Sequence, residues 1–298
     1  MASPELTKVI ELLRALPRPE SGTTPVGFLR AAMDAMAEPA PSQVAVREVT
    51  VAGCAADWLV PKGADPSRRL LYLHGGGYVA GSRKSHRALA SRIARASGVV
   101  ALLLEYRLAP ESPFPAALDD ARAALAWMRE NSPEGPGAAA RTFIAGDSAG
   151  GGLTLATLLA ERAARGPLPD AAVTLSAWTD LAVSGESMRT HATRDPMISD
   201  ADVGAWGRHY AGQSDPREPL VSPLYGDLAG LPPVLMHVGE EEVLLDDTLR
   251  FATRARAAGS DVTSVVFPEL FHVFHVFAGM LSEAREAIGS VGDFLRAR

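Results

Sequence analysis

The chain has 298 residues, of which 47% are hydrophobic and 21% are charged, and this composition is typical of a globular protein with a buried core. Its net charge of −6 comes without a basic stripe, so we do not expect nucleic acid as a partner. The single cysteine, Cys54, excludes an internal disulfide, and no apolar run is long enough to span a membrane.

The N-terminal segment, residues 1–45, has the pattern of two amphipathic helices. Its first residues lack the basic and apolar regions of a signal peptide, so we expect a cytoplasmic protein. Apolar side chains recur at helical spacing at Val9, Leu12, Leu13 and Leu16. Pro17-Arg18-Pro19 then breaks the pattern, and a second helix is expected from Val26 to Met36. These helices either stabilise the fold as an arm or cover a pocket as half of a lid.

The rest of the chain alternates apolar runs with helical patterns. Strands are expected at Val44–Val51, Ala55–Val60, Leu70–His74, Val99–Leu104, Val173–Ser176, Val234–Val238 and Val262–Phe267. Helices are expected at Ser85–Ala96, Pro115–Glu130, from Ser148 to Gly166, and at Asp202–Tyr210, Thr248–Ala258 and Glu283–Leu295. Continuous apolar strands separated by helices predict a parallel sheet that is covered on both faces. Residues of about 180–230 lack a strand pattern and are interpreted as an insertion.

The segment 143–152 combines a buried strand, a turn with glycine on both sides of Ser148, and a helix start. This is the G-x-S-x-G pattern of a nucleophile elbow, in which a strained turn lifts the serine hydroxyl clear of the sheet. Gly146 and Gly150 leave room for the close approach of strand and helix, and the helix N-terminus offers free N–H groups to an oxyanion. The alternative is a glycine-rich turn that only caps a helix.

A serine nucleophile needs a general base and an acid that orients it, in the chain order serine, acid, histidine. Only His272 and His275 follow the late strands, and His272 is preferred because it lies closer to the strand end. His275 is expected to pack among apolar residues or to be partly exposed. Five carboxylates lie between Glu240 and Asp247. Most are expected to be a solvated run, with Asp246 and Asp247 at a helix start, and one of the five must orient the imidazole.

A second glycine-rich loop, His74-Gly75-Gly76-Gly77, follows a predicted strand and can supply backbone N–H groups for an oxyanion hole together with Ala149. Such a loop can also bind phosphate. No Lys-Ser or Lys-Thr pair directly follows these glycines, and the sequence has no G-x-G-x-x-G, so the pattern disfavours a nucleotide site.

Together with the elbow, this loop resembles those of the hormone-sensitive-lipase-like esterases, the bacterial family IV group of the α/β-hydrolase superfamily. Further matching motifs are Tyr106-Arg107-Leu108-Ala109-Pro110-Glu111 and Phe114-Pro115-Ala116-Ala117, which Asp119-Asp120 follows. The likeness extends from about Leu70 to the C-terminus, and the N-terminal helices agree with the cap of that family.

The resemblance implies an α/β-hydrolase fold, with a mostly parallel eight-stranded sheet, helices on both faces and a helical cap. Residues 1–45 would be cap helices, and residues 46–298 the catalytic domain with a cap insertion at about 180–225. It also implies Ser148 as nucleophile, His272 as base, and N–H groups of Gly76, Gly77 and Ala149 as the oxyanion hole. The acid motif of the family, Asp-x-Leu-x-Asp, fits Glu242–Asp246, which makes Glu242 the acid and Glu241 the alternative.

One motif departs from the family, because His-Gly-Phe is here His272-Val273-Phe274. A valine excludes the backbone conformation that only glycine tolerates, which leaves the shape of this loop open.

These residues predict a serine carboxylic-ester hydrolase that acts on short- to medium-chain acyl esters through an acyl-enzyme, without a metal or cofactor. Met33, Tyr78, Trp206 and Tyr210 are candidates for the substrate pocket, and packing in the cap core is the alternative for each. An amidase or deacetylase would use the same catalytic residues. Two other classes are a receptor that has lost the triad and a scaffold with a decayed site. A homodimer through residues 262–298 is a further expectation.

Overall fold

A computed structural model describes residues 3–15 and 23–298, so the predicted break at Pro17-Arg18-Pro19, and Leu16 before it, lie outside the described residues. The helices are α1 (Pro4–Ala15), α2 (Val26–Ala35), α3 (Arg83–Ser97), α4 (Ala116–Glu130), α5 (Ala149–Ala163), α6 (Ser187–Thr190), α7 (Asp200–Ala211), α8 (Leu245–Ala257) and α9 (Ser282–Arg296), with short 3-10 helices η1 (Pro223–Tyr225) and η2 (Phe274–Phe277). The strands are β1 (Val44–Val51), β2 (Cys54–Pro61), β3 (Asp65–Leu73), β4 (Val99–Leu104), β5 (Asn131–Ser132), β6 (Gly135–Pro136), β7 (Arg141–Asp147), β8 (Ala171–Leu175), β9 (Val234–Gly239) and β10 (Val262–Phe267).

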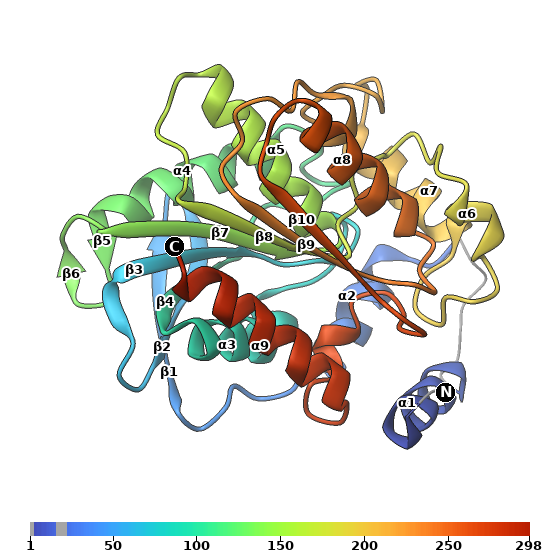
Figure 1. The fold of residues 1–298 in the computed structure, drawn as a ribbon, viewed down its shortest axis with the longest axis horizontal. Helices are drawn as coiled ribbons and strands as arrows, with labels where there is room; N and C mark the ends of the chain where they lie inside the picture. The colour runs from blue at the N-terminus through green and yellow to red at the C-terminus, as the bar shows by residue number, and fades with distance from the viewer. Residues whose placement is uncertain (1–2, 16–22) are drawn as a thin grey trace.

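Eight strands form one sheet in the order β1-β2-β4-β3-β7-β8-β9-β10 (Figure 1). β2 runs antiparallel to both β1 and β4, and the remaining pairs are parallel. The parallel pairs require crossovers on the faces of the sheet, which the helices between the strands supply. The predicted α/β fold with a mostly parallel eight-stranded sheet is therefore confirmed.

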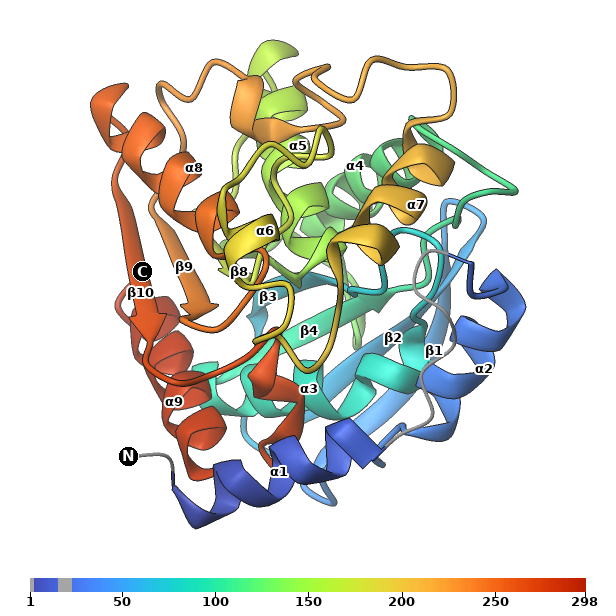
Figure 2. The same ribbon diagram turned by 90° about the vertical axis from the view of Figure 1, so that its right-hand side faces the viewer.

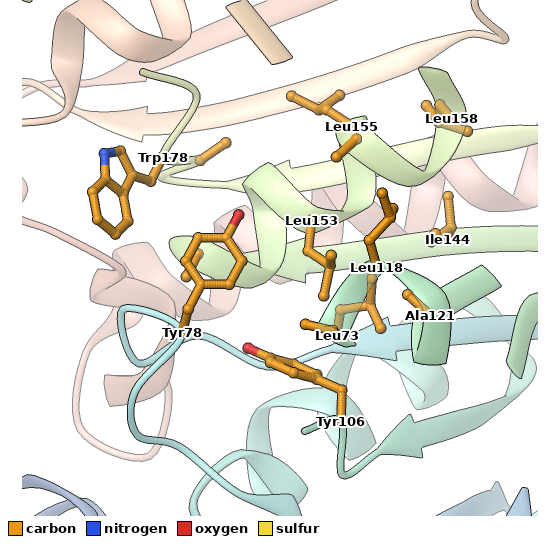
Figure 3. Close-up of a cluster of buried hydrophobic side chains, with 14 of the residues drawn as sticks. Leu73, Tyr78, Tyr106, Leu118, Ala121, Ile144, Leu153, Leu155, Leu158 and Trp178 are labelled. Carbon is orange, nitrogen blue, oxygen red and sulfur yellow. The ribbon is translucent and has the colours of Figure 1, made fainter. Parts of the chain in front are cut away.

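Each face of the sheet carries its own hydrophobic core, because neighbouring residues in a strand point to opposite sides. In β3, Leu71 and Leu73 join the core under α4, α5 and α8, whereas Leu70 and Tyr72 join the core that contains α1, α3 and α9. Figure 3 shows part of the first core. All six residues of β4 are buried, as expected for a continuous apolar run that is covered on both faces.

The predicted elements differ from the structure mainly at their ends. β3 begins at Asp65, five residues before the predicted start, and its register with β4 shifts between Asp65 and Arg69. The polar start of this strand has no apolar pattern to mark it. The hairpin of β5 and β6 was not predicted, because two residues per strand are too few for a periodicity to appear.

The helices α1, α2, α6 and α7 lie toward the edge at which the parallel strands end, and Figure 2 looks onto this edge. α1 buries Leu6, Val9 and Leu13 in the same core as α9. α2 has no fully buried side chain, but its half-buried Val26, Leu29 and Met33 pack against the core that contains α4, α5 and α8, and polar contacts add to this packing. Its Arg30 donates hydrogen bonds to the backbone oxygens of Val79 (2.8 Å) and Ala109 (3.0 Å). No helix within residues 3–15 and 23–298 combines the length and hydropathy needed to cross a membrane.

Candidate active site

Ser148 stands in the sharp turn between β7 and α5 and is 9% exposed. Its φ of 51° and ψ of −120° are strained for a serine, at a cost on the order of 1–3 kcal/mol. The turn depends on close backbone contacts, because a Cβ at Gly150 would lie 2.1 Å from the oxygen of Leu73. The strand, strained serine and helix therefore have the geometry of the predicted nucleophile elbow.

The structure brings Ser148, His272 and Glu242 together from three separate loops. His272 Nε2 lies 2.9 Å from Ser148 Oγ, and its Nδ1 lies 2.9 Å from Glu242 Oε2. An ionised carboxylate can only accept, so Nδ1 carries the proton and Nε2 is free to accept the hydroxyl hydrogen of Ser148. This is the arrangement that a general base for a serine nucleophile requires.

The alternatives for the base and the acid lie elsewhere. Glu241 is partly exposed and pairs with Arg194. His275 is fully buried in η2, where its ring stacks on His237, so it packs as expected and is not partly exposed. Neither side chain contacts Ser148 or His272 through a hydrogen bond among the described residues.

The carboxylate of Glu242 is held from behind by two donors. Its Oε1 accepts hydrogen bonds from the hydroxyl of Ser176 (2.6 Å) and from the N–H of Gly239 (2.5 Å). The hydroxyl of Ser176 in turn accepts a hydrogen bond from the N–H of Val273 (3.0 Å). Ser176 was predicted only as the end of a strand. The signal in the sequence that could have indicated its role is that a polar residue directly follows β8, the buried strand that pairs with β7.

The loop 74–77 lies beside the elbow. Gly76 has a φ of +114°, and a Cβ there would lie 2.3 Å from the oxygen of Ala80, so only glycine fits this turn. The N–H groups of Gly76, Gly77 and Ala149 take part in none of the hydrogen bonds of residues 3–15 and 23–298. Unpaired donors beside a nucleophile are what an oxyanion hole requires.

The amino-acid sequence and the fold both match known proteins. A family model described as alpha/beta hydrolase fold matches residues 70–276. The chain belongs to the α/β-hydrolase family. An acetyl-hydrolase of Streptomyces hygroscopicus is 46% identical over 99% of this chain and 97% of its own length. A solved esterase of the bacterial hormone-sensitive lipase family is 43% identical, with a TM-score of 0.90 over 100% of this chain and 99% of its own. Another solved esterase, whose crystal was soaked with p-nitrophenyl butyrate, is 40% identical to this chain, with a TM-score of 0.92 over 99% of both chains. The predicted family is therefore confirmed.

In this α/β-hydrolase, Asp147 links the elbow to the loop of Gly75. The buried Asp147 accepts a hydrogen bond from the hydroxyl of Tyr72 (2.8 Å) and lies 3.2 Å from Nε2 of His86. Burial opposes its ionisation, but the bonds from His86 and Tyr72 and the nearby His74 lower the pKa of Asp147 on balance. A Cβ at Gly75 would lie 2.2 Å from Oδ2 of Asp147, so the carboxylate packs directly against the loop.

The four residues predicted for the substrate pocket fall into two groups. Tyr78 and Tyr210 are each 1% exposed and stack with ring centroids 3.6 Å apart, so they pack closely against each other. Met33 and Trp206 are partly exposed. Trp206 lies against the loop 74–77, because a Cβ at Gly77 would lie 2.6 Å from its ring carbon Cε3. Trp206 and Tyr210 are one turn apart on α7 and therefore contact adjacent residues of the loop, Gly77 and Tyr78.

Two expectations about loop residues were wrong. Val273 adopts the left-handed conformation that a valine was expected to exclude, with φ of 46° and ψ of 41°. Its burial at 5% exposure and its hydrogen bond to Ser176 outweigh a strain on the order of 1–3 kcal/mol. Asp247 lies in the first turn of α8, as expected, but it is fully buried and not part of a solvated run, and it accepts hydrogen bonds from the N–H groups of Thr179 and Asp180. Burial raises its pKa to about 8.

The electrostatics around His272 predict the pH dependence of a base-catalysed reaction. Burial disfavours the charged imidazole, but the hydrogen bond to Glu242 and the negative charges of Glu242, Asp195 and Asp147 raise the pKa of His272 on balance. Burial, with the charge of Glu242, also raises the pKa of Asp195 to about 6. Only neutral His272 can accept a proton, so activity should be present above its pKa and lost below it.

We therefore expect kcat/KM to rise with pH along a limb whose midpoint lies above ~6.5, the ordinary value for histidine. The profile is measured with a soluble acetate ester at constant ionic strength, with protein stability checked at each pH. A midpoint at or below that value would contradict the assigned environment of His272.

Proposed function

We propose that this α/β-hydrolase is a serine carboxylesterase that acts on short- to medium-chain acyl esters. The observation that carries the proposal is the continuous contact of Ser148 Oγ, His272 and Glu242. A receptor that had lost its triad would not need this geometry. The printed activity of the 46% identical relative, acetyl-hydrolase, supports a short acyl group.

In the proposed mechanism, Ser148 Oγ attacks the ester carbonyl carbon while its proton passes to Nε2 of His272. Glu242 holds the imidazole in the working tautomer and stabilises its positive charge. The N–H groups of Gly76, Gly77 and Ala149 bind the oxyanion. The bond from carbon to the alkoxy oxygen then breaks, and the leaving alcohol takes the proton from Nε2. Water repeats the sequence on the acyl-enzyme and releases the acid.

The test of this proposal is the hydrolysis of p-nitrophenyl esters from acetate to palmitate. We expect short and medium acyl chains to be turned over and palmitate to be a poor substrate. An anilide of the same acyl group distinguishes an esterase from an amidase. A wild-type protein that is as inert as its Ser148→Ala variant would overturn the proposal.

The chain-length limit is assigned to Trp206, whose indole lies against Gly77 of the oxyanion loop. Trp206→Ala should open space beside the bound carbonyl and raise the preference for octanoate over acetate by about tenfold or more in kcat/KM. Trp127→Ala is the matched control, because Trp127 of α4 is also partly exposed and packs on Trp58 of β2, with ring centroids 6.0 Å apart. Equal chain-length profiles for the two variants would contradict the role of Trp206.

We further propose that α1, α2 and residues of about 180–225 form a cap over the site, since these elements lie at the edge where the strands end.

We also propose a homodimer through β10 and α9. β10 is one of the two outer strands of the sheet, and its Val266 is 39% exposed. A cytoplasmic location is also proposed, and the single buried thiol of Cys54 is in keeping with it.

A further inference from the structure

Ser176 occupies a fully buried position directly after β8, in a left-handed backbone conformation with φ of 52°. Its own N–H donates to the backbone oxygen of His237 in β9 at 2.7 Å, which fixes the residue between two strand ends. From there its hydroxyl makes two hydrogen bonds, one to Glu242 Oε1 at 2.6 Å and one from the N–H of Val273 at 3.0 Å. One hydroxyl thus joins the loops of the acid and the base.

We propose that Ser176 is a positioning residue that holds Glu242 and His272 in mutual alignment, an inference that rests on the proposed function. A carboxylate is planar, so a donor that fixes Oε1 also fixes Oε2, the oxygen that lies 2.9 Å from His272 Nδ1. The peptide plane of the Val273 N–H is shared with the carbonyl of His272. The same hydroxyl therefore restrains both partners of that hydrogen bond.

Experiment can distinguish a positioning role of the Ser176 hydroxyl from a role in packing alone. A buried serine that only fills space would affect stability, whereas a positioning serine would also change how His272 titrates. His272 faces the carboxylates of Glu242, Asp195 and Asp147, and it also lies near the imidazole of His275. Of these groups, Glu242 alone is hydrogen bonded to His272. Loss of the Ser176 hydroxyl should therefore weaken the hydrogen bond between Glu242 and His272, which favours the charged imidazole.

We expect Ser176→Ala to lower kcat for p-nitrophenyl acetate by about 10–100-fold with little change in KM, because a small misplacement of a catalytic group is enough for such a loss. The acidic limb of kcat/KM should move to lower pH, since the bond that raises the pKa of His272 is weakened. Ser176→Cys has a thiol that donates and accepts weakly, so its kcat and its acidic limb should lie between those of Ser176→Ala and of the wild type.

Ser260→Ala is the matched control. Ser260 is also buried, and its hydroxyl also donates once, to the oxygen of Leu228 at 2.6 Å, and accepts once, from the N–H of Leu231 at 3.1 Å. It should lose stability in a similar way and keep the wild-type kcat and pH limb. If Ser176→Ala behaves like Ser260→Ala in an active enzyme, the inference is wrong.

A second measurement does not depend on turnover. The proton on His272 Nδ1 should give a low-field NMR resonance in the wild type, which Ser176→Ala should shift or abolish and Ser260→Ala should leave in place. If this effect is seen in a protein without esterase activity, Ser176 positions the histidine and the proposed function fails. If the resonance is unchanged in Ser176→Ala, the positioning role fails and the proposed function stands. Should the alanine variant not fold, the same readouts in Ser176→Cys decide, and wild-type values there would overturn the inference.

Discussion

Ser148→Ala should lower kcat by on the order of a million-fold, because it removes the nucleophile of a unit whose members act together. A residual rate on the order of 10³ above the uncatalysed reaction is expected, since the donors of the oxyanion hole stay in place. KM should change little, because the hydroxyl contributes to bond formation more than to binding. The measurement is the rate of p-nitrophenyl acetate hydrolysis, together with the burst of p-nitrophenol that accompanies the formation of the acyl-enzyme.

The matched control for this substitution is Ser290→Ala. Ser290 lies on α9, and its hydroxyl donates to the backbone oxygen of Ala287 at 2.9 Å, far along the chain from the elbow. This variant should keep the full rate and the full burst. A Ser148→Ala protein that retains more than a few per cent of the rate would show that another residue is the nucleophile.

Glu242→Gln should lower kcat by about 10⁴-fold, the scale measured when the acid of another serine triad is replaced by its amide. The amide group of glutamine can turn its NH₂ toward Nδ1 of His272, which favours the tautomer with the proton on Nε2. That nitrogen can then no longer accept the proton of Ser148. The acidic limb of kcat/KM should also move to lower pH, because the negative charge that raises the pKa of His272 is gone.

Glu241→Gln is the natural control, because Glu241 is the neighbouring carboxylate and pairs with Arg194 near the surface. An exposed ion pair contributes little, so this variant should stay within about twofold of the wild type. Equal losses in the two variants would mean that the acid has been assigned to the wrong residue. Comparison of the Glu242→Gln and Glu241→Gln variants therefore decides which of the two carboxylates is the acid of the triad.

The parts of the site that the sequence predicted are those in which chemistry is carried by neighbouring residues. The elbow around Ser148 and the glycines of the loop at Gly76 are local patterns, since strain and close approach demand particular residues at fixed spacing. The apolar run of β4 likewise predicts a strand covered on both faces. Choice of Glu242 over Glu241 required the spacing of a family motif, because both residues are carboxylates in the same loop.

The parts that were missed depend on contacts between distant segments. Ser176 and Glu242 are 66 residues apart, and no periodicity in either segment indicates that they meet. The conformation of Val273 was mispredicted for the same reason, because the bond that offsets its strain comes from Ser176, 97 residues away. Asp247 was expected in water because the local sequence is acidic, whereas its partners Thr179 and Asp180 lie on another loop.

The packing of α7 on the oxyanion loop has a consequence for heat inactivation. Trp206 and Tyr210 contact Gly77 and Tyr78 from a helix outside the sheet, which joins the core on one face through Val203, Tyr210 and Ala211, whereas the inner strands are covered by a core on each face. Local opening of such a peripheral element requires less free energy than global unfolding. We therefore expect warming to release α7 and loosen the loop of Gly76 and Gly77 while the sheet stays intact, so that activity is lost below the melting temperature of the protein.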